Sequence, residues 1–445
     1  MKTMETVLLE GGIVVTMDEK GTILERGSVL IEGDRIAAVG KPEDVRKLGK
    51  PDTVIDARGM VIMPGLISIH HHSAVFEHGM GEELGLERYL DELYYPVLKA
   101  MKPEEAYVAA MLSYAEALKT GTTCVLDMYV HMDKCGEAAE DIGIRAFLSG
   151  TGGDLGEGLE PVEENERVLR EKHGAADGRV QVWFGVEWLP LCSPEFLDKV
   201  SEKASEYGVG VHIHLSESLG EVELCKEKFG ERPAERAYNH GLLGPKCVAA
   251  HCVWLSMREV KVLKETGTHV AHCPVSNMKL AVGVAPVRAM LEEGVNVGLG
   301  PDDMTCNNNL DMFEVMKYAS LLQKVSNLDA SLIPSRKALE MATVNGARAL
   351  GIADEVGSIE PGKKADIILV DLRKPRFTPT LFGEYFNLYS HLVYTAHGDD
   401  VDTVIVDGRV VVRNRRLLTV DEEELLERGY KTALEVLERR KEFLE

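Results

Sequence analysis

Three consecutive histidines end one apolar segment of the sequence, "MVIMPGLISIHHHSAVF" at residues 60–76. Residues i and i+2 of a β-strand point to the same side, so His70 and His72 can hold one ion together. His71 points to the other side of that strand, and we expect it to have a structural or supporting role. The segment therefore predicts two metal ligands.

Other short apolar segments also end in residue types that bind metals. The segments "HIHLSES", "AAHCVWL", "VAHCPVSN" and "GLGPDD" supply His214 with Glu217, His251, His272 and Asp302. A single histidine at a strand end is more often an ordinary hydrogen-bonded residue, but so many at successive strand ends are hard to obtain by accident. Histidine nitrogens with one carboxylate suit Zn²⁺, with Fe²⁺ and Mn²⁺ as alternatives, and leave room for water. We expect one divalent metal ion.

The segments that carry these residues alternate with helical patterns such as "PEEAYVAAMLSYAEALKTG" and "SPEFLDKVSEKASEYG". Residues 61–356 hold eight strand-then-helix units, the number that closes a parallel (β/α)8 TIM barrel. The C-terminal ends of the strands form one face of such a barrel, and active sites lie on that face. The barrel prediction therefore brings the histidines and carboxylates together.

Both ends of the chain are rich in short strands separated by turns, as in "GSVLIEGDRIAAVG" and "VDTVIVDGRVVVRNRRLL". We expect residues 1–60 and 357–445 to form one discontinuous β-sandwich domain, with a charged C-terminal helix from Val420 to Glu445. The fold class is then α/β, a barrel with a smaller domain built from both termini.

Composition excludes several classes of function. The formal charge of −23 argues against a nucleic-acid partner, because phosphate binding needs clustered Lys and Arg. No apolar run is long enough to span a bilayer, and the N-terminus has no signal-peptide pattern. The eight cysteines form no C-x-x-C pair and fit neither a disulfide framework nor a structural zinc site. We expect a soluble cytoplasmic protein that acts on a small molecule.

Taken in order, the segments "PGLISIHHH", "HIHLSE", "AHCVWL", "SNMKLAVGVAPV" and "GLGPDD…NNNLDMF" resemble the amidohydrolase superfamily. The chain is most similar to the branch of S-adenosylhomocysteine and methylthioadenosine deaminases and triazine hydrolases. The resemblance covers nearly the whole chain and implies a homo-oligomer, a dimer or higher. It implies metal ligands at His70, His72, His214 and Asp302, with Glu217 as proton shuttle and His251 orienting the metal-bound water.

This resemblance agrees with the chemistry of the residues. A metal ion lowers the pKa of its water toward neutrality, so that hydroxide can attack an sp² carbon. Glu217 can pass a proton to a ring nitrogen, and Asp302 can hydrogen-bond the hydroxide. We expect a hydrolytic deaminase that releases ammonia from an amino-substituted purine, pteridine, pyrimidine or triazine-like ring.

Three alternatives accompany that hypothesis. A triazine-type hydrolase would expel chloride or an alkylamine, and an S-adenosylhomocysteine or methylthioadenosine deaminase would act on a nucleoside. Two departures from the family pattern weaken the nucleoside alternative: Glu187 and Trp188 replace a Pro-His sequence, and Leu98 replaces a ribose-binding carboxylate. A non-catalytic metal scaffold is disfavoured because neither a ligand nor the proton shuttle is missing.

Four residues are expected near the substrate. Glu187 could pair with an amino-substituted or cationic substrate or bridge a second metal, and Trp188 could stack on a flat ring together with the Tyr94–Tyr95 pair. Those tyrosines could equally pack a helix end. Asp303 is either a pocket residue or a solvated loop charge, and His78 lies in the loop that leaves the first barrel strand.

Overall fold

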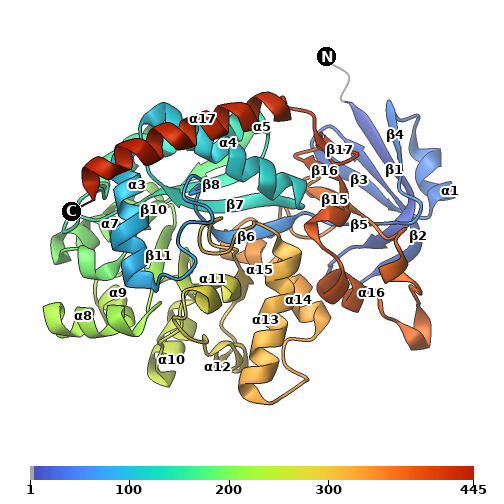
Figure 1. Cartoon of the computed structure of the whole chain (residues 1–445). Helices are drawn as coiled ribbons and strands as arrows, with labels where there is room; N and C mark the ends of the chain where they lie inside the picture. The colour runs from blue at the N-terminus through green and yellow to red at the C-terminus, as the bar shows by residue number, and fades with distance from the viewer. Residues whose placement is uncertain (1–4, 445) are drawn as a thin grey trace.

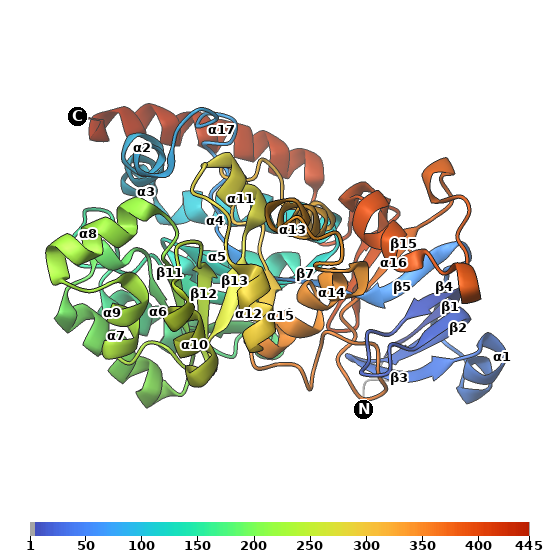
Figure 2. The ribbon, with the colours of Figure 1, turned by 90° about the horizontal axis from the view of Figure 1, so that it is seen from below.

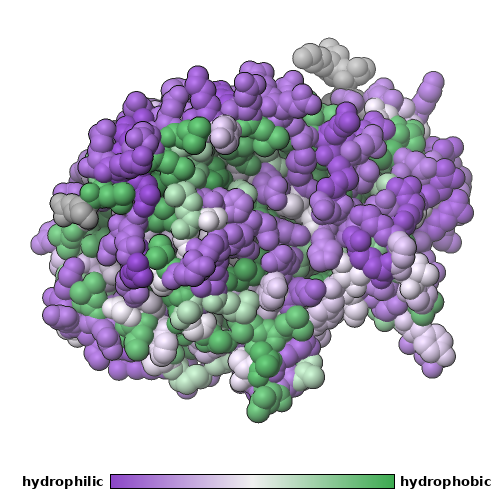
Figure 3. Space-filling model, viewed as in Figure 1, coloured by the Kyte–Doolittle hydropathy of each residue, from purple (hydrophilic) through white to green (hydrophobic). Residues whose placement is uncertain are grey.

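The computed structural model of the protein describes residues 5–444. A barrel and a separate sheet built from both termini lie side by side (Figures 1 and 2). Polar and charged residues cover much of the face in Figure 3, above all over the terminal sheet and the C-terminal helix. Among the described residues, no helix is both long enough and apolar enough to cross a membrane.

The barrel consists of parallel strands in two hydrogen-bonded sets, which closes the predicted (β/α)8 arrangement. The first set is β6 (Leu66–His71), β7 (Thr122–Tyr129), β8 (Arg145–Gly150) and β9 (Val180–Val182). The second is β10 (Phe184–Val186), β11 (Val211–Leu215), β12 (Cys247–His251), β13 (His269–His272) and β14 (Val297–Leu299).

β9 and β10 are two halves of the fourth barrel strand, which changes partner at Trp183. The Trp183 N–H donates to the Leu148 carbonyl of β8 at 2.8 Å, whereas the Phe184 N–H donates to the Gly210 carbonyl at 3.0 Å. At the other seam, the His72 N–H donates to the Asp302 carbonyl at 3.2 Å. That bond joins the end of the first barrel strand, β6, to the segment after the last barrel strand, β14. The expected ligands His72 and Asp302 therefore lie next to each other where the barrel closes.

Helices surround the barrel, and their ends follow from local sequence. α7 begins after Ser193, whose hydroxyl accepts the Phe196 N–H, has Pro194 at its first position and ends at Gly208 with φ +67°. The barrel helices are α4 (Pro103–Lys119), α5 (Met132–Ile142), α6 (Val162–Lys172), α7 (Pro194–Tyr207), α8 (Leu219–Phe229), α9 (Pro233–Asn239), α10 (Met257–Thr266), α11 (Pro274–Lys279), α12 (Val287–Glu293), α13 (Met312–Asn327), α14 (Ser335–Met341) and α15 (Val344–Ala349).

The strands from the two termini are hydrogen-bonded as one nine-stranded sheet in the order β18-β17-β16-β15-β5-β1-β2-β3, with β4 beside β1. They are β1 (Thr6–Val15), β2 (Ile23–Glu32), β3 (Arg35–Gly40), β4 (Thr53–Asp56), β5 (Met60–Pro64), β15 (Ile367–Asp371), β16 (Val401–Val406), β17 (Arg409–Arg413) and β18 (Arg416–Leu417). β5 pairs with β15 antiparallel. The sheet therefore reaches Pro64, beyond the residue 60 expected from the sequence, and the first barrel strand begins at Leu66.

The C-terminal helix α17 (Glu422–Arg440) lies along α4 of the barrel rather than on the terminal sheet (Figure 1). The Arg439 side chain donates to the Ala100 carbonyl at 2.7 Å, and it also pairs with Glu105. The helix predicted for residues 420–445 is thus present, and it belongs spatially to the barrel.

Candidate active site

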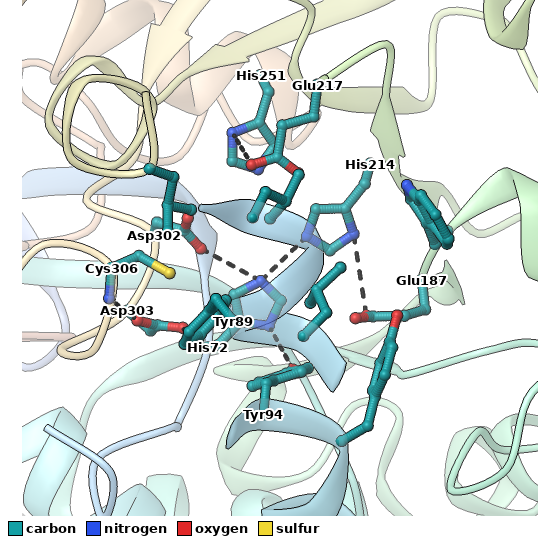
Figure 4. Close-up of a pocket in the computed structure, with 15 residues that line it drawn as sticks. His72, Tyr89, Tyr94, Glu187, His214, Glu217, His251, Asp302, Asp303 and Cys306 are labelled. Atoms are coloured by element: carbon teal, nitrogen blue, oxygen red, sulfur yellow. Dashed lines mark hydrogen bonds and ion pairs between the residues drawn. The ribbon is translucent and has the colours of Figure 1, made fainter. Parts of the chain in front are cut away.

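Four expected ligands converge at the C-terminal face of the barrel. The Nε2 atom of His72 lies 3.3 Å from His70 Nε2 and 3.2 Å from His214 Nε2. The Asp302 Oδ1 atom lies 3.4 Å from both His70 Nε2 and His72 Nε2. All four side chains are buried. Figure 4 shows His72, His214 and Asp302 pointing to one place.

These spacings fit a tetrahedral metal ion. An ion about 2.0–2.1 Å from each of four tetrahedral ligand atoms would hold neighbouring ligand atoms about 3.3 Å apart. Four of the six distances among the ligand atoms are 3.2, 3.3, 3.4 and 3.4 Å, close to this value. Burial lowers the pKa values of His70, His72 and His214, which favours the neutral imidazole that a metal requires. The three imidazoles and one carboxylate are therefore suited to a divalent ion.

Each of three expected ligands makes a hydrogen bond through the side-chain atom that points away from the shared metal position. With Nε2 of His70 toward the shared point, its Nδ1–H lies 2.8 Å from His212 Nε2, and His212 Nδ1 lies 3.0 Å from the Ser149 hydroxyl. The His72 Nδ1–H donates to the Met128 carbonyl at 2.6 Å. The Ser276 hydroxyl donates to Asp302 Oδ2 at 2.6 Å. Such bonds set the ring orientation and the tautomer of a ligand.

Alternation along "HIHLSES" predicts that His212 shares the face of His214 but lies deeper in the barrel. Ser276 stands in the segment "SNMKL", and its spacing indicates no role for it. What they bond to depends on other strands, so their roles follow from the barrel rather than from spacing.

Glu217 and His251 lie together beside the four ligands. His251 Nδ1 is 2.9 Å from Asn277 Oδ1 and 3.5 Å from Glu217 Oε1. The pKa of Glu217 is raised well above its usual range by burial and by the neighbouring Asp302 carboxylate. A carboxyl group that keeps its proton near neutral pH is the kind that acts as a general acid.

The backbone is left-handed at Ser216, at His251 with the next residue Cys252, and at Asp302. Their φ values are 52°, 66°, 52° and 75°. Non-glycine residues in this conformation are uncommon and cluster at functional sites, where the surrounding structure enforces them. The carboxylate of Glu221 supports the first of these turns, because it accepts the N–H groups of Ser216 and Glu217 at 3.0 and 2.6 Å.

His71 and His272 do not join the cluster. His71 Nε2 lies 2.7 Å from the Ser113 hydroxyl of α4, and its ring lies beside Tyr114. His71 therefore packs in the barrel wall, the structural alternative predicted from strand alternation. His272 is buried and belongs to neither group of ligand atoms close enough to share an ion in the described chain.

A pocket lies over the cluster. Its walls come from the ends of the barrel strands and from α2 (Leu86–Tyr89), a π-helical turn (Leu90–Tyr94) and α3 (Tyr95–Ala100). The cavity is small, about 30 Å³. π-Helical turns are often found at functional sites.

Of the four residues expected near the substrate, three line the pocket and one does not. Glu187, Trp188 and Asp303 line the pocket, as do Tyr94 and Tyr95. Asp303 is buried, and its Oδ1 accepts the Thr305 N–H at 2.7 Å, so it is not a solvated loop charge. His78 is exposed and is not brought to the pocket. Leu98 is buried in α3 and is likewise absent from the lining.

Glu77, in the loop after β6, gives a prediction about stability. Its carboxylate is fully buried without a hydrogen-bond partner in the described chain, and burial raises its pKa from 4.5 to about 7. The unfolded chain therefore loses this proton first, and folding becomes less favourable as pH rises from about 4.5 to 7, by up to about 3 kcal/mol. Glu77→Gln cannot titrate. Its free energy of unfolding relative to wild type should rise by that amount between pH 4 and pH 8.

Denaturant unfolding at both pH values measures the effect. The matched control is Glu83→Gln, which changes an exposed glutamate of the same loop. An equal difference between Glu77→Gln and wild type at both pH values would show that Glu77 ionises normally.

Comparisons with known proteins agree with this site. A model described as the amidohydrolase family matches residues 61–411. A 5′-deoxyadenosine deaminase of Methanosarcina acetivorans is 43% identical over 440 residues, 98% of this chain and 99% of the relative. An adenosine deaminase structure from Xanthomonas campestris with bound zinc has a TM-score of 0.91 at 28% identity, over 97% of this chain and 98% of that one. A zinc complex of atrazine chlorohydrolase from Arthrobacter aurescens has a TM-score of 0.85 at 26% identity, over 96% of this chain and 100% of that one.

Proposed function

The chain belongs to the amidohydrolase family and is a hydrolase of carbon–nitrogen bonds, and on this basis we propose that it is a metal-dependent deaminase of an amino-substituted N-heterocycle. One observation carries the proposal: the Nε2 atom of His72 lies 3.3 Å from His70 Nε2, 3.2 Å from His214 Nε2 and 3.4 Å from Asp302 Oδ1, beside a pocket that His72, His214 and Asp302 line. The ligand set proposed is His70, His72, His214 and Asp302.

The bound ion is proposed to be Zn²⁺, with Fe²⁺ and Mn²⁺ as alternatives. A set of three nitrogens and one oxygen suits zinc, and two of the similar solved structures contain it. When bound, a divalent ion lowers the pKa of a water molecule toward neutrality and makes it a nucleophile.

Two side chains next to the ligands supply proton transfer and orientation. We assign to Glu217, a buried carboxyl group whose pKa is raised by burial and by the Asp302 carboxylate, the role of giving a proton to a ring nitrogen of the heterocycle. His251 is held by Asn277 at 2.9 Å and lies close enough to His70 and His214 to orient the water that attacks the ring. Asp302 is the third catalytic group, because its carboxylate can accept a hydrogen bond from the same water.

The substrate ring is proposed to lie against Trp188, with Asp303 near its polar edge. The Trp188 indole N–H has no partner in the described part of the chain, although it is buried in the pocket wall.

Trp188→Ala should raise KM about tenfold, equivalent to about 1.4 kcal/mol, and change kcat little, because stacking holds the ring before and during reaction. Steady-state kinetics of this variant and of Trp188→Phe check the assignment. If stacking dominates, Trp188→Phe keeps a KM close to wild type, whereas an unchanged KM in Trp188→Ala would place the ring elsewhere.

Ammonia release tests the function as a whole. Zinc-loaded protein is incubated with 5′-deoxyadenosine, adenosine and a panel of amino-substituted purines, pteridines, pyrimidines and triazines. We expect stoichiometric ammonia and the corresponding oxo product from at least one member. Absence of ammonia from every compound, with one bound ion per chain, would contradict the proposal.

The second candidate is a triazine-type hydrolase that expels chloride or an alkylamine. The likeness to atrazine chlorohydrolase favours it, since displacement at a ring carbon would use the same metal ligands. Chloride or alkylamine released without ammonia from substituted triazines would select this function. The expected homo-oligomer and cytoplasmic location stay predictions from the sequence.

A further inference from the structure

Most histidines around the metal-binding position have a hydrogen-bond partner for Nδ1, the ring nitrogen that points away from that position. Nδ1 of His70, His72 and His251 faces His212, the Met128 carbonyl and Asn277, at 2.8, 2.6 and 2.9 Å. Nδ1 of His214 is the exception, since it is buried and has no hydrogen-bond partner among the described residues. A histidine that binds a metal through Nε2 nearly always donates its other N–H to a carboxylate, a carbonyl or water. A partner for His214 is therefore missing from the set.

The nearest acceptor is Glu187. Its Oε2 atom lies 3.9 Å from His214 Nδ1, too far for a hydrogen bond but within reach of a small side-chain rotation (Figure 4). Glu187 is 4% exposed, and the same Oε2 atom has no other partner in the described chain. A buried donor and a buried acceptor, both unpaired, thus face one another, and each is costly to leave unpaired.

Strand register explains why these residues meet. β10 and β11 are parallel neighbours in which Val186 lies opposite Ile213. Glu187 and His214 are the next residues of the two strands, so their side chains leave the barrel wall on the same side. The Glu187 N–H donates to the Gly152 carbonyl at 3.0 Å, which fixes the start of the side chain.

We propose that Glu187 is a positioning residue for the metal centre: its carboxylate accepts the Nδ1–H of His214 and holds that ring with Nε2 toward the ion. The inference rests on the metal centre of the proposed function, but not on the identity of its substrate. It gives Glu187 a role that differs from both roles expected from the sequence, a contact to a cationic substrate and a ligand of a second ion.

The geometry disfavours the second-ion role. In the described part of the chain, the ligand groups close enough to share an ion are His70 with His214 and His251, and His70 with His72 and Asp302. Glu187 belongs to neither group. The Oε2 atom is buried without a partner among the described residues, and His214 Nδ1, 3.9 Å away, is a buried donor in the same position.

Metal affinity tests the proposal without any substrate. Competition with a chromophoric chelator gives the Zn²⁺ dissociation constant of wild type, Glu187→Gln and Glu187→Leu. We expect an increase of about 10- to 100-fold for Glu187→Leu, which removes the acceptor. Glu187→Gln should lie between Glu187→Leu and wild type, because its amide oxygen can still accept the bond but carries no charge. The visible spectrum of the Co²⁺-substituted protein should shift in the same order, since it reports the ligand field.

Trp188→Phe is the matched control, because it removes an unpaired polar atom from the adjacent residue without touching a ligand. Its Zn²⁺ dissociation constant should equal that of wild type. Circular dichroism confirms that each variant is folded, and Glu187→Gln, which keeps the size of the side chain, serves if Glu187→Leu does not fold. In metal-saturated Glu187→Gln and Glu187→Leu, kcat should fall below the wild-type value by a factor that is the same for every substrate, while KM stays constant.

Two outcomes would overturn the proposal. Unchanged Zn²⁺ affinity in folded Glu187 variants, together with a KM that rises for some substrates only, would make Glu187 a substrate contact. Two ions per chain in wild type and one in Glu187→Leu would make it a metal ligand. If the protein binds zinc as expected but deaminates nothing, the deaminase proposal fails while this inference stands.

Discussion

Replacing Glu217 by glutamine is expected to lower kcat by about 10²- to 10⁴-fold, the range that a positioned general acid or base contributes. The glutamine has nearly the same size and can keep the contact with His251 Nδ1, which lies 3.5 Å from Glu217 Oε1. It cannot carry the proton that the ring nitrogen receives. The metal should stay bound, because Glu217 is not one of the four proposed ligands.

Steady-state kinetics and metal analysis of the same preparation separate these effects. The matched control is Glu223→Gln, an exposed position of helix α8, which begins two residues after Glu217; this variant should turn over like wild type. Loss of zinc from Glu217→Gln would mean that Glu217 supports the metal rather than the proton transfer. A kcat within tenfold of wild type would show that another group moves the proton.

Replacing His72 by alanine is expected to abolish both metal binding and activity, with kcat/KM reduced by at least roughly 10⁴-fold. His72 Nε2 is central to the cluster, at 3.3 Å from His70, 3.2 Å from His214 and 3.4 Å from Asp302. Without it, two imidazoles and one carboxylate remain around a gap. Treatment of wild-type protein with a strong chelator should reproduce the loss, and added Zn²⁺ should restore activity to wild type but not to the variant.

The adjacent histidine provides the contrast. His71→Gln should keep about one zinc ion per chain, because His71 bonds to Ser113 in the barrel wall and not to the ion. It should lower the melting temperature, since it disturbs a fully buried contact between β6 and α4. Metal analysis and thermal unfolding of both variants check the pair. Zinc lost from His71→Gln, or zinc kept by His72→Ala, would contradict the assignment.

The fold was accessible from the sequence because its signals are local. Eight apolar segments with helical patterns between them predict a parallel barrel, and period-two alternation separates His70 and His72 from His71. Asp302 and His214 were found because polar residues at the ends of buried strands stand out against apolar runs. The boundary at residue 60 was less well placed, because the run from Met60 to His71 reads as one apolar segment. In the structure it is divided between β5 of the terminal sheet and β6 of the barrel.

The substrate residues show where local signals end. The sequence predicts Glu187 and Trp188 near the substrate and leaves Asp303 as a pocket residue or a solvated loop charge; all three line the pocket. His78, predicted from its position after the first barrel strand, is exposed and does not line the pocket. Nothing in the residue type distinguishes these cases, since the path of a loop depends on what packs against it.

By itself, the sequence determined the barrel, the metal-binding residue types and the pairing of a proton-carrying carboxyl group with them. These depend on residues a few positions apart in one strand. Only the tertiary structure decided which groups stand behind the ligands: His212 behind His70, Ser276 behind Asp302 and Glu187 facing His214. It also decided that α2 and α3 line the pocket. Those contacts join residues far apart in the chain, and barrel closure and helix packing alone set the distances between them.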